Sequence, residues 1–408
     1  MKILFVNSFY SPDIAGGAER SVKRLADLHH KAGHQVSALT THGGKAPVLD
    51  DVDGVAVHRI PVHNIYWHRQ PDQPAAWKRM LWHGIDSYNP LSERSARRVL
   101  ESVKPDIISC HNLAGLSISV WHAARQLRIP VVQVLRDYYN ICPRVTCYRD
   151  GHLCEGQCGS CGVFRLPHRA ASNHVSAVVG CSQAVLQKHL DQGYFANVLH
   201  KQVIYNAEHT PLPATVDRPA DRPFTFGYIG ALTEVKGITE MLDAVLQAKT
   251  ANPRRMRMLI AGTGPESFVD GLKTKYASTD IEFLGHTAPA TLFAQIDASI
   301  VPSVWDDPLP GVVFQALAHG LPVIGAARGG IPEMVKHGVN GLLYNPSDAN
   351  ALAEAITQML SDDALVQGLA QGARQSAAPF LDENRLFSDY MSLYGKVLSL
   401  HSNCLITT

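Results

Sequence analysis

The chain has 408 residues, of which 46% are hydrophobic and 18% are charged, a composition typical of a folded, soluble protein and not of a disordered one. A chain of this length ordinarily folds around more than one hydrophobic core, so we expect two domains. No apolar run approaches the roughly 20 residues of a spanning helix, and residues 1–7 are too short for a signal peptide's apolar core. We therefore expect a cytoplasmic protein, free or peripheral at the inner face of a membrane.

The net charge of +1 is unevenly distributed. Residues 1–205 carry 23 Lys and Arg against 15 Asp and Glu, a balance of +8, whereas the remaining residues have a balance of −7. The basic half suits an anionic membrane surface or a phosphorylated acceptor, and chance drift between two domains is the alternative. The small net charge and the lack of a recognised module argue against nucleic-acid binding.

The first half alternates short apolar runs with helical patterns. We expect strands at 2–7, 35–40, 55–60, 106–110 and 131–135, and helices at 18–32, 92–103 and 116–127. Such alternation predicts a parallel sheet covered by helices on both faces.

The second half repeats this alternation. We expect strands at 224–229, 257–261, 281–283, 298–302 and 322–325, and helices at 238–249, 312–318, 349–360 and 364–376. Pro211, Pro213, Pro219 and Pro223 mark a linker at 206–222.

These patterns predict two domains, 1–205 and 206–385, and a C-terminal helix over 386–408 that packs back toward the first domain. Ligands of open α/β sheets bind beyond the carboxyl ends of the strands, so both domains are expected to point their loops into one cleft.

Residues 303–323 form the most informative segment. They run from a strand end through an acidic, Pro- and Gly-rich turn into a helix that stops at Gly320. The backbone N–H groups of Gly311 to Val313 open that helix, and a helix start of this kind binds a phosphate or a polar sugar.

Two further segments place candidate binding residues after strands. Gly16 and Gly17 follow the first strand and let the backbone approach a ligand closely, with a plain tight turn as the alternative. His111 lies at the carboxyl end of the strand at 106–110, where polar residues usually do chemistry, with an ordinary loop histidine as the alternative.

These segments, together with 135–143, 227–237 and 329–343, resemble glycosyltransferases of family 4 over nearly the whole chain. The resemblance implies the GT-B fold, an α/β architecture of two Rossmann-like doubly wound domains facing a central cleft. It also implies a retaining, metal-independent transfer of a sugar from a nucleotide-sugar donor to a glycan, a glycolipid or another hydroxyl acceptor. The first domain would be the acceptor side and the second the donor side.

The resemblance also assigns residue roles. Gly16 and Gly17 would approach the donor diphosphate, Lys236 would stabilise the leaving diphosphate, and His286 would flank the base. Asp307 and the amides of Gly311, Val312 and Val313 would contact the sugar, and Gln315 would take the position that grips the ribose diol. The residues expected to carry catalysis are Lys236, Asp307, Asp137, His111 and Arg136.

Four positions depart from the family pattern. Arg136 replaces a histidine, Ala231 an arginine, and Asp307 and Gln315 two glutamates. These departures leave open a non-catalytic homologue that serves as a nucleotide-binding or partner subunit. A phosphorolytic or sugar-phosphate-forming relative is a further alternative.

Five of the eight cysteines fall between 142 and 161, an insertion in the first domain. A disulfide scaffold is not expected in a cytoplasmic chain of this size. Cys147, Cys154, Cys158 and Cys161 have spacings that suit a tetrahedral structural zinc, with Cys142 as a fifth or substitute ligand. An iron–sulfur cluster and free thiols are the alternatives. Such a metal would shape the acceptor side and is not required for catalysis.

Aromatic and basic residues alternate in 66–69 and again in 77–82, which we expect to form an inserted loop of the basic domain. Trp with Lys and Arg suits an interfacial contact with anionic lipid. A partly buried acceptor loop is the alternative.

Overall fold

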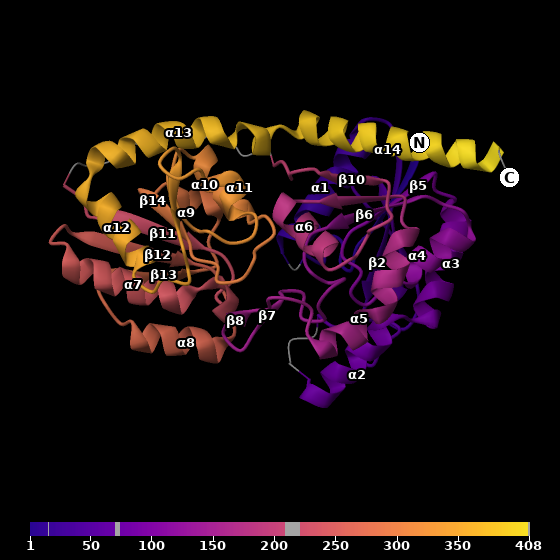
Figure 1. Ribbon diagram of the computed structural model, residues 1–408, viewed down its shortest axis with the longest axis horizontal. Coiled ribbons are helices and arrows are strands. Elements are labelled where there is room, and N and C mark those ends of the chain that lie inside the picture. The colour runs from indigo at the N-terminus through magenta and orange to yellow at the C-terminus, as the bar shows by residue number, and fades with distance from the viewer. Residues whose placement is uncertain (15, 70–73, 209–220, 407–408) are drawn as a thin grey trace. The chain divides into compact units, whose positions relative to one another are not determined.

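The computed structural model describes residues 1–14, 16–69, 74–208 and 221–406 (Figure 1). The chain divides into two compact units. The first comprises Met1–Cys147, Cys154–Asn206 and Glu383–Thr408, and the second comprises Tyr148–Leu153 and Ala207–Asp382. Most of the predicted linker, including Pro211, Pro213 and Pro219, lies outside the described residues.

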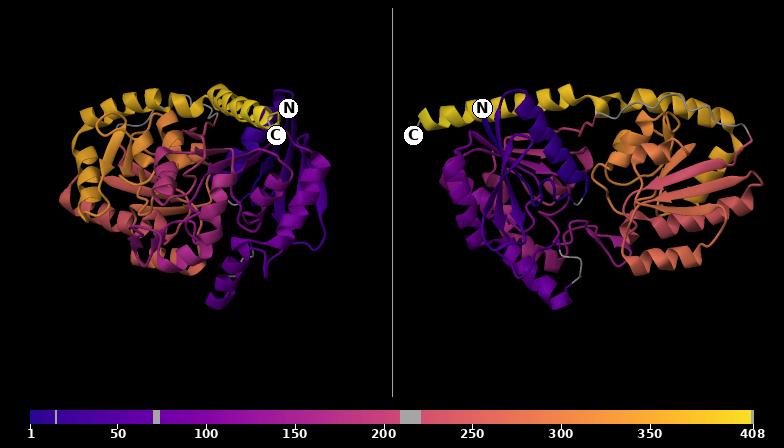
Figure 2. Two further views of the ribbon diagram at one scale, coloured as in Figure 1. Left: turned by 45° about the vertical axis from the view of Figure 1, so that its right-hand side comes forward. Right: turned by 180° about the vertical axis from the view of Figure 1, so that it is seen from behind.

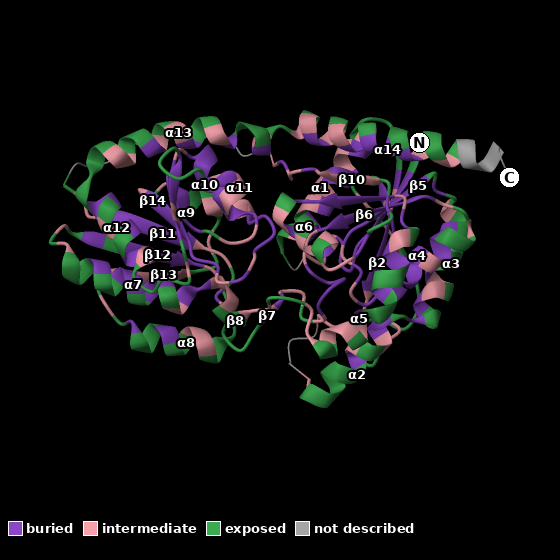
Figure 3. Ribbon diagram, in the orientation of Figure 1, coloured by how far each residue is buried: buried purple, intermediate pink, exposed green. Residues whose placement is uncertain are grey.

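The first unit is built on an eight-stranded sheet in the order β10-β9-β6-β5-β1-β2-β4-β3. Its strands are β1 (Lys2–Val6), β2 (Gln35–His42), β3 (Val48–Val52), β4 (Val55–Pro61), β5 (Ile107–Cys110), β6 (Val131–Leu135), β9 (Ala177–Gly180) and β10 (His200–Val203). Strands β1, β5, β6 and β9 are almost entirely buried, as their near-continuous apolar sequences require (Figure 3).

The sheet of the first unit is parallel except at one edge, where β3 runs antiparallel to β4. Asp53 and Gly54 join the two strands with φ of 54° and 83°, the left-handed pair that a tight hairpin turn requires. The expectation of a wholly parallel sheet is therefore wrong at this edge.

Helices cover both faces of this sheet (Figure 2). They are α1 (Gly17–Lys31), α2 (Ala76–Ser87), α3 (Pro90–Val103), α4 (Ser119–Gln126), α5 (Gly159–Ala171), α6 (Gln183–Asp191) and α14 (Glu383–Ile406). Helix α14 packs on α1, where the buried His29 ring lies 5.0 Å from the Phe387 ring and 5.5 Å from the Tyr394 ring.

The second unit is built on a six-stranded parallel sheet in the order β13-β12-β11-β14-β15-β16. Its strands are β11 (Phe224–Ile229), β12 (Met256–Ala261), β13 (Ile281–Gly285), β14 (Ala298–Val301), β15 (Val323–Ala326) and β16 (Gly341–Tyr344). The helices are α7 (Ile238–Ala251), α8 (Glu266–Lys275), α9 (Pro289–Phe293), α10 (Gly311–Ala318), α11 (Ile331–Met334), α12 (Ala351–Ser361) and α13 (Asp363–Leu381).

Each sheet reverses its strand order at one point. In the first unit the chain proceeds outward from β1 in one direction and from β5 in the other, and in the second unit from β11 and β14. Loops at the carboxyl ends of such adjacent strands diverge and leave room for a ligand. The candidate sites are therefore expected beside β1 and β5, and beside β11 and β14.

Two details differ from the sequence-based expectation. Residues 77–82, expected within an inserted loop, lie in helix α2 (Ala76–Ser87). The Cys-rich insertion was assigned wholly to the first domain, yet its hairpin of β7 (Tyr148–Arg149) and β8 (His152–Leu153) belongs to the second unit. Among the described residues we find no helix with the length and apolar character needed to cross a membrane.

Candidate active site

The loop after β11 presents Lys236, at the end of a short 3-10 turn (Glu234–Lys236). Gly237 ends that turn with φ of 70°, and a Cβ at this position would lie 2.0 Å from the Pro302 carbonyl oxygen. Only glycine therefore lets the Lys236 loop lie directly against the chain that leaves β14. The Val304 amide also donates to the Val235 carbonyl at 3.1 Å, which joins the two loops.

Lys236 and Asp307 meet at this junction. The Lys236 Nζ lies 2.5 Å from Asp307 Oδ2, and the ammonium sits 5.5 Å from the centre of the Trp305 ring. Ser303 Oγ lies 3.4 Å from the same carboxylate oxygen. The Asp307 side chain is 8% exposed and that of Lys236 is 26% exposed, so the pair is largely shielded while its cation still reaches the surface.

The backbone of Asp307 is fixed from the other side by the Gly329–Gly330 segment. Gly330 donates its amide to the Asp307 carbonyl at 2.8 Å. Gly329 has φ of 53°, and a Cβ there would lie 2.2 Å from that carbonyl oxygen. The paired glycines thus allow the close approach that holds the acidic turn in place.

Helix α10 begins where the turn ends. Pro310 precedes the helix, and the Val313 amide donates to the Pro310 carbonyl at 3.0 Å. This bond occupies the Val313 amide, one of the amides expected to contact the sugar. The half-buried Gly311 and Val312 then supply the first amides of the helix.

Gln315 lies one turn into α10 and is half-buried. Its Nε2 donates to Glu208 Oε2 at 3.1 Å, so a carboxylate does stand beside this position, supplied by another segment. No sequence motif pointed to Glu208. His286 is exposed in the loop after β13, which β12 separates from β11, and its position beside the base stays a prediction.

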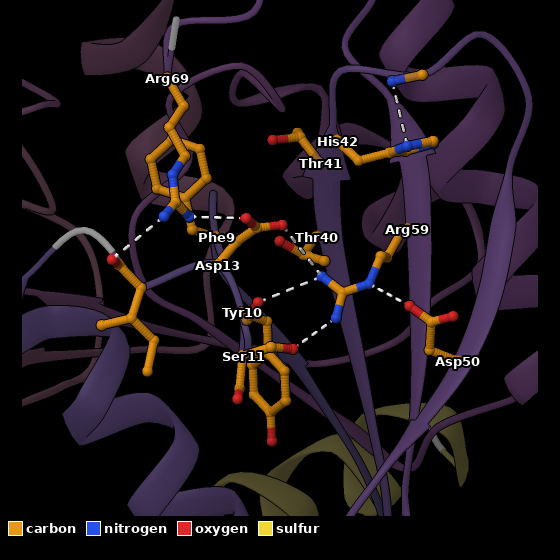
Figure 4. A network of polar contacts seen from close by, with 12 residues as sticks. Phe9, Tyr10, Ser11, Asp13, Thr40, Thr41, His42, Asp50, Arg59 and Arg69 are labelled. Atoms are coloured by element: carbon orange, nitrogen blue, oxygen red, sulfur yellow. Dashed lines mark hydrogen bonds and ion pairs between the residues drawn. The ribbon is translucent and has the colours of Figure 1, made fainter. Parts of the chain in front are cut away.

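In the first unit, the loop after β1 is held by two arginines (Figure 4). The buried Arg59 of β4 donates to the carbonyls of Tyr10 and Ser11 at 3.2 and 2.5 Å, and its Nε bonds Asp50. Arg69 donates to Asp13 Oδ1 at 2.9 Å. These contacts set the path of the chain that leads to Gly16.

Gly16 precedes helix α1 with an extended backbone, and its amide donates to Glu19 Oε2 at 2.7 Å. The buried Glu19 carboxylate therefore already occupies one of the amides expected to approach a diphosphate. At Gly17 an added Cβ would meet nothing within 4 Å, so this glycine faces open space.

His111 follows β5 and is buried. Arg136 donates its Nε to His111 Nδ1 at 3.0 Å, and Ser109 Oγ lies 3.1 Å from His111 Nε2. Burial, followed by the nearby Arg136 charge, holds the pKa of His111 well below its usual range, so the ring is neutral. With both nitrogens in hydrogen-bond contact, His111 positions Arg136, and its catalytic role stays a prediction.

Asp137 follows β6, and one carboxylate oxygen accepts from Asn112 Nδ2 at 2.9 Å while the other accepts from the Tyr139 amide at 2.8 Å. Burial raises the pKa of Asp137 to about 6, and the Glu19 charge adds to the rise. Arg136 also donates to Asn206 Oδ1 at 2.8 Å. The fold therefore gathers Gly16, His111, Arg136 and Asp137 from three loops, two of them at the switch point of the sheet.

Sequence reasoning missed a buried polar group beneath this loop cluster. Asp86 accepts hydrogen bonds from the Tyr139 hydroxyl and the Gly115 amide, both at 2.8 Å. The Arg165 guanidinium, fully buried, lies 4.3 Å from the Tyr139 ring centre. Burial raises the pKa of Asp86 to about 6 although Arg165 opposes the rise. No sequence pattern assigned this role to Asp86.

Two thiols of the Cys-rich segment, those of Cys147 and Cys161, lie against Cys142. Cys161 Sγ lies 3.9 Å from Cys142 Sγ. Hydrogen bonds from Cys147 and Cys161 hold the pKa of the Cys142 thiol far below its usual range. Across the ranges that the structure describes, no group of three or more His, Cys, Asp or Glu side chains is arranged to hold a metal ion. The zinc expected at Cys147, Cys154, Cys158 and Cys161 stays a prediction.

Two family patterns match this chain. Residues 16–201 match the family described as glycosyl transferase 4-like domain, and residues 223–362 match glycosyl transferases group 1. The first match includes Gly16 and the loops after β5 and β6, and the second includes Lys236, Asp307 and α10. The chain is a glycosyltransferase with the GT-B fold.

Individual relatives and solved structures are similar to this chain over most of its length. An uncharacterized 42.6 kDa protein in the cps region of Klebsiella pneumoniae is 29% identical over 334 residues, which cover 82% of this glycosyltransferase and 87% of that protein. Sucrose-phosphate synthase from Thermosynechococcus elongatus superposes with a TM-score of 0.74 at 19% identity, over 98% of this chain and 99% of that one. Anabaena HepE in complex with UDP and glucose superposes with a TM-score of 0.71 at 21% identity, over 97% and 99% of the chains.

Proposed function

We propose that this glycosyltransferase is a retaining enzyme of family 4 that takes its sugar from a nucleoside diphosphate sugar and needs no metal ion for the transfer. The observation that carries this proposal is the Lys236–Asp307 pair at the switch point of the second sheet, 2.5 Å apart beside the start of α10. A solved structure of the same fold, HepE, binds UDP and glucose, which favours a uridine nucleotide as the first donor to test.

The second unit supplies the groups that a departing diphosphate needs. The Lys236 ammonium has three N–H donors, and its contact with Asp307 leaves donors for phosphate oxygens. The Gly311 and Val312 amides at the start of α10 add a partial positive charge. Fixed cationic donors of this kind stabilise charge that develops as the glycosidic bond breaks.

The first unit supplies polar groups for the acceptor. Asp137 is half-buried with a pKa of about 6, and Arg136 is half-buried beside it. In the proposed reaction they orient the acceptor hydroxyl, and the donor phosphate takes the proton of that hydroxyl. The acceptor is a glycan, a lipid-linked glycan or another hydroxyl compound, and the enzyme works at an anionic membrane surface.

Methanol as a surrogate acceptor tests the stereochemistry and the metal requirement together. The protein is incubated with UDP-α-glucose and other nucleotide sugars in methanol-containing buffer with EDTA, and the methyl glycoside is identified by proton NMR. Because methyl glycosides do not change anomer in solution, an α-product from an α-donor supports retention. A β-product, or turnover abolished by EDTA and restored by a divalent cation, would contradict the proposal.

A further inference from the structure

Exposed apolar side chains are concentrated on two neighbouring helices of the first unit. Trp77, Met80 and Leu81 of α2 are 62%, 61% and 49% exposed, and Val163 and Leu166 of α5 are 75% and 72% exposed. Helices α2 and α5 pack on each other and lie together in Figure 3. We call these five side chains the α2–α5 patch. Apolar groups gathered in this way mark an interaction site more often than scattered ones do.

The two helices are firmly held on their inner sides, so the patch is not the result of a loosely placed segment. Trp82 of α2 is buried and donates its Nε1 to the Tyr66 carbonyl at 3.0 Å. Ser87 bonds the Phe164 carbonyl of α5, and Arg165 and His168 of α5 are buried. The outward direction of the patch follows from these contacts.

The exposed charged residues of α2 and α5 are all basic. Lys78 and Arg79 of α2 and Arg169 of α5 are exposed, and the Lys78 Nζ lies 5.6 Å from the Trp77 ring centre. Over both helices, all of whose residues are described, Asp86 is the single acidic residue and it is buried. Two helices that expose Trp, aliphatic groups and cations but no carboxylate of their own complement anionic lipid headgroups.

The start of α2 is exposed on every side. Residues 76–81 are six consecutive exposed positions, which exceed one full turn of 3.6 residues. A groove in a protein partner would cover one face of a helix and leave the other face in water. A lipid headgroup layer surrounds an inserted helix end, so it suits a segment that is apolar and basic around its circumference.

We propose that the α2–α5 patch is a membrane-docking surface, with its apolar side chains entering the headgroup region of an anionic bilayer and Lys78, Arg79 and Arg169 contacting lipid phosphates. This inference deepens the proposed function, since it names the surface at which the enzyme would meet a lipid-linked acceptor. It adds α5, a helix of the Cys-rich segment, to the aromatic–basic segment identified in the sequence.

Vesicle co-sedimentation of the full chain tests the proposal without requiring turnover. The wild-type protein is expected to sediment with phosphatidylcholine vesicles that contain phosphatidylglycerol, and not with phosphatidylcholine alone, and high salt is expected to release it. Substituting Trp77→Ser together with Leu166→Ser is expected to weaken binding roughly tenfold or more, because a buried apolar side chain contributes about 1.5–3 kcal/mol. The matched control is Leu199→Ser, at another exposed leucine of the first unit.

Two results would overturn the docking surface. One is a wild-type protein that fails to bind anionic vesicles, and the other is a double variant that binds as tightly as the wild type. A dimer that forms with rising concentration and is lost in the double variant would instead assign the patch to a second copy of the chain, which also overturns the proposal. Donor methanolysis measured in the absence of lipid separates these outcomes from a failure of the proposed transferase activity. Matching thermal unfolding of the variants excludes misfolding.

Discussion

Lys236 and Asp307 lie 2.5 Å apart although 70 residues separate them in the chain, and two glycine contacts account for their meeting. Gly237 lets the Lys236 loop touch the Pro302 carbonyl, and Gly329 lets another loop touch the Asp307 carbonyl. The ion pair is therefore imposed by backbone packing at the switch point of the sheet. A diphosphate that binds there would share the Lys236 cation with a carboxylate that is already in place.

The first prediction concerns Gly237. We expect Gly237→Ala to destabilise the protein by about 1–3 kcal/mol from the positive φ alone, and further from the contact with Pro302. It should also weaken UDP binding, because the Lys236 loop must move. Gly338→Ala is the matched control, since Gly338 has φ of 76° and a Cβ there would meet nothing within 4 Å. Thermal unfolding measures the loss of stability, and calorimetry measures the loss of UDP affinity. If both losses were the same in Gly237→Ala and Gly338→Ala, the result would count against the packing argument.

The second prediction concerns Gln315 and Glu208, whose side chains meet at 3.1 Å. Substituting Gln315→Glu places two carboxylates against each other, and we expect it to weaken UDP binding by about 1 kcal/mol, roughly fivefold. Adding Glu208→Gln should restore binding, because the carboxylate and the amide are then exchanged between the two positions. Calorimetric titration with UDP measures both. A Gln315→Glu variant that binds UDP more tightly would show that Glu208 does not act at this position.

The third prediction uses the buried Asp86, whose pKa burial raises to about 6 from an ordinary value of 3.8. The folded state holds this proton more tightly than the unfolded chain, so the free energy of unfolding falls as pH rises from about 4 to 6. Asp86→Asn removes this dependence. Its free energy of unfolding relative to that of wild type should therefore rise by up to about 3 kcal/mol between pH 4 and 7. Urea unfolding at several pH values measures the difference. The control is Asp191→Asn, at an exposed aspartate, whose free energy of unfolding relative to wild type should not vary with pH. A difference that is equally independent of pH for Asp86→Asn would contradict the argument.

The fourth prediction concerns His29, which is buried between α1 and α14. Burial lowers the pKa of His29 to about 3, so the unfolded chain binds the proton more tightly and stability is lost as pH falls below 6.5. Each pH unit in that window costs about 1.4 kcal/mol. We expect His29→Phe to retain a higher unfolding midpoint than wild type at pH 4.5 and a similar one at pH 7.5. The control is His30→Gln, at an exposed histidine. If His29→Phe lost as much stability as wild type on acidification, the result would be inconsistent with this explanation.

Much of the fold was predictable because buried parallel strands and amphipathic helices leave separate patterns. The strand at 224–229 and the helix start near 238 were located to the residue or nearly so. The edge strand β3 was missed because its residues 48–52 are mostly exposed and its apolar residues do not alternate with polar ones, although Asp53-Gly54 carried a hairpin signal. Helix α2 was missed because its exposed first turns have no apolar stripe facing the core.

The site was less predictable than the fold, since its details depend on contacts between distant segments. Lys236 and Asp307 were recognised from their motifs, and their contact is consistent with those motifs. No sequence motif indicated that Glu208 would lie beside Gln315, or that Glu19 would accept from the Gly16 amide. His111 could be placed at a strand end, but its burial and its bond from Arg136 required the three-dimensional structure.

The most direct test of the account is turnover of a panel of nucleotide sugars by wild type and Lys236→Ala, read as released nucleoside diphosphate. We predict that one donor is turned over and that Lys236→Ala lowers its rate by about 10²–10³-fold, as loss of a fixed electrostatic donor does. Lys273→Ala, an exposed lysine of the same unit, should leave the rate unchanged. A Lys236→Ala variant that keeps the full wild-type rate would contradict the assignment of the active site to Lys236 and Asp307. Binding of a donor without any turnover would favour a non-catalytic, nucleotide-binding subunit.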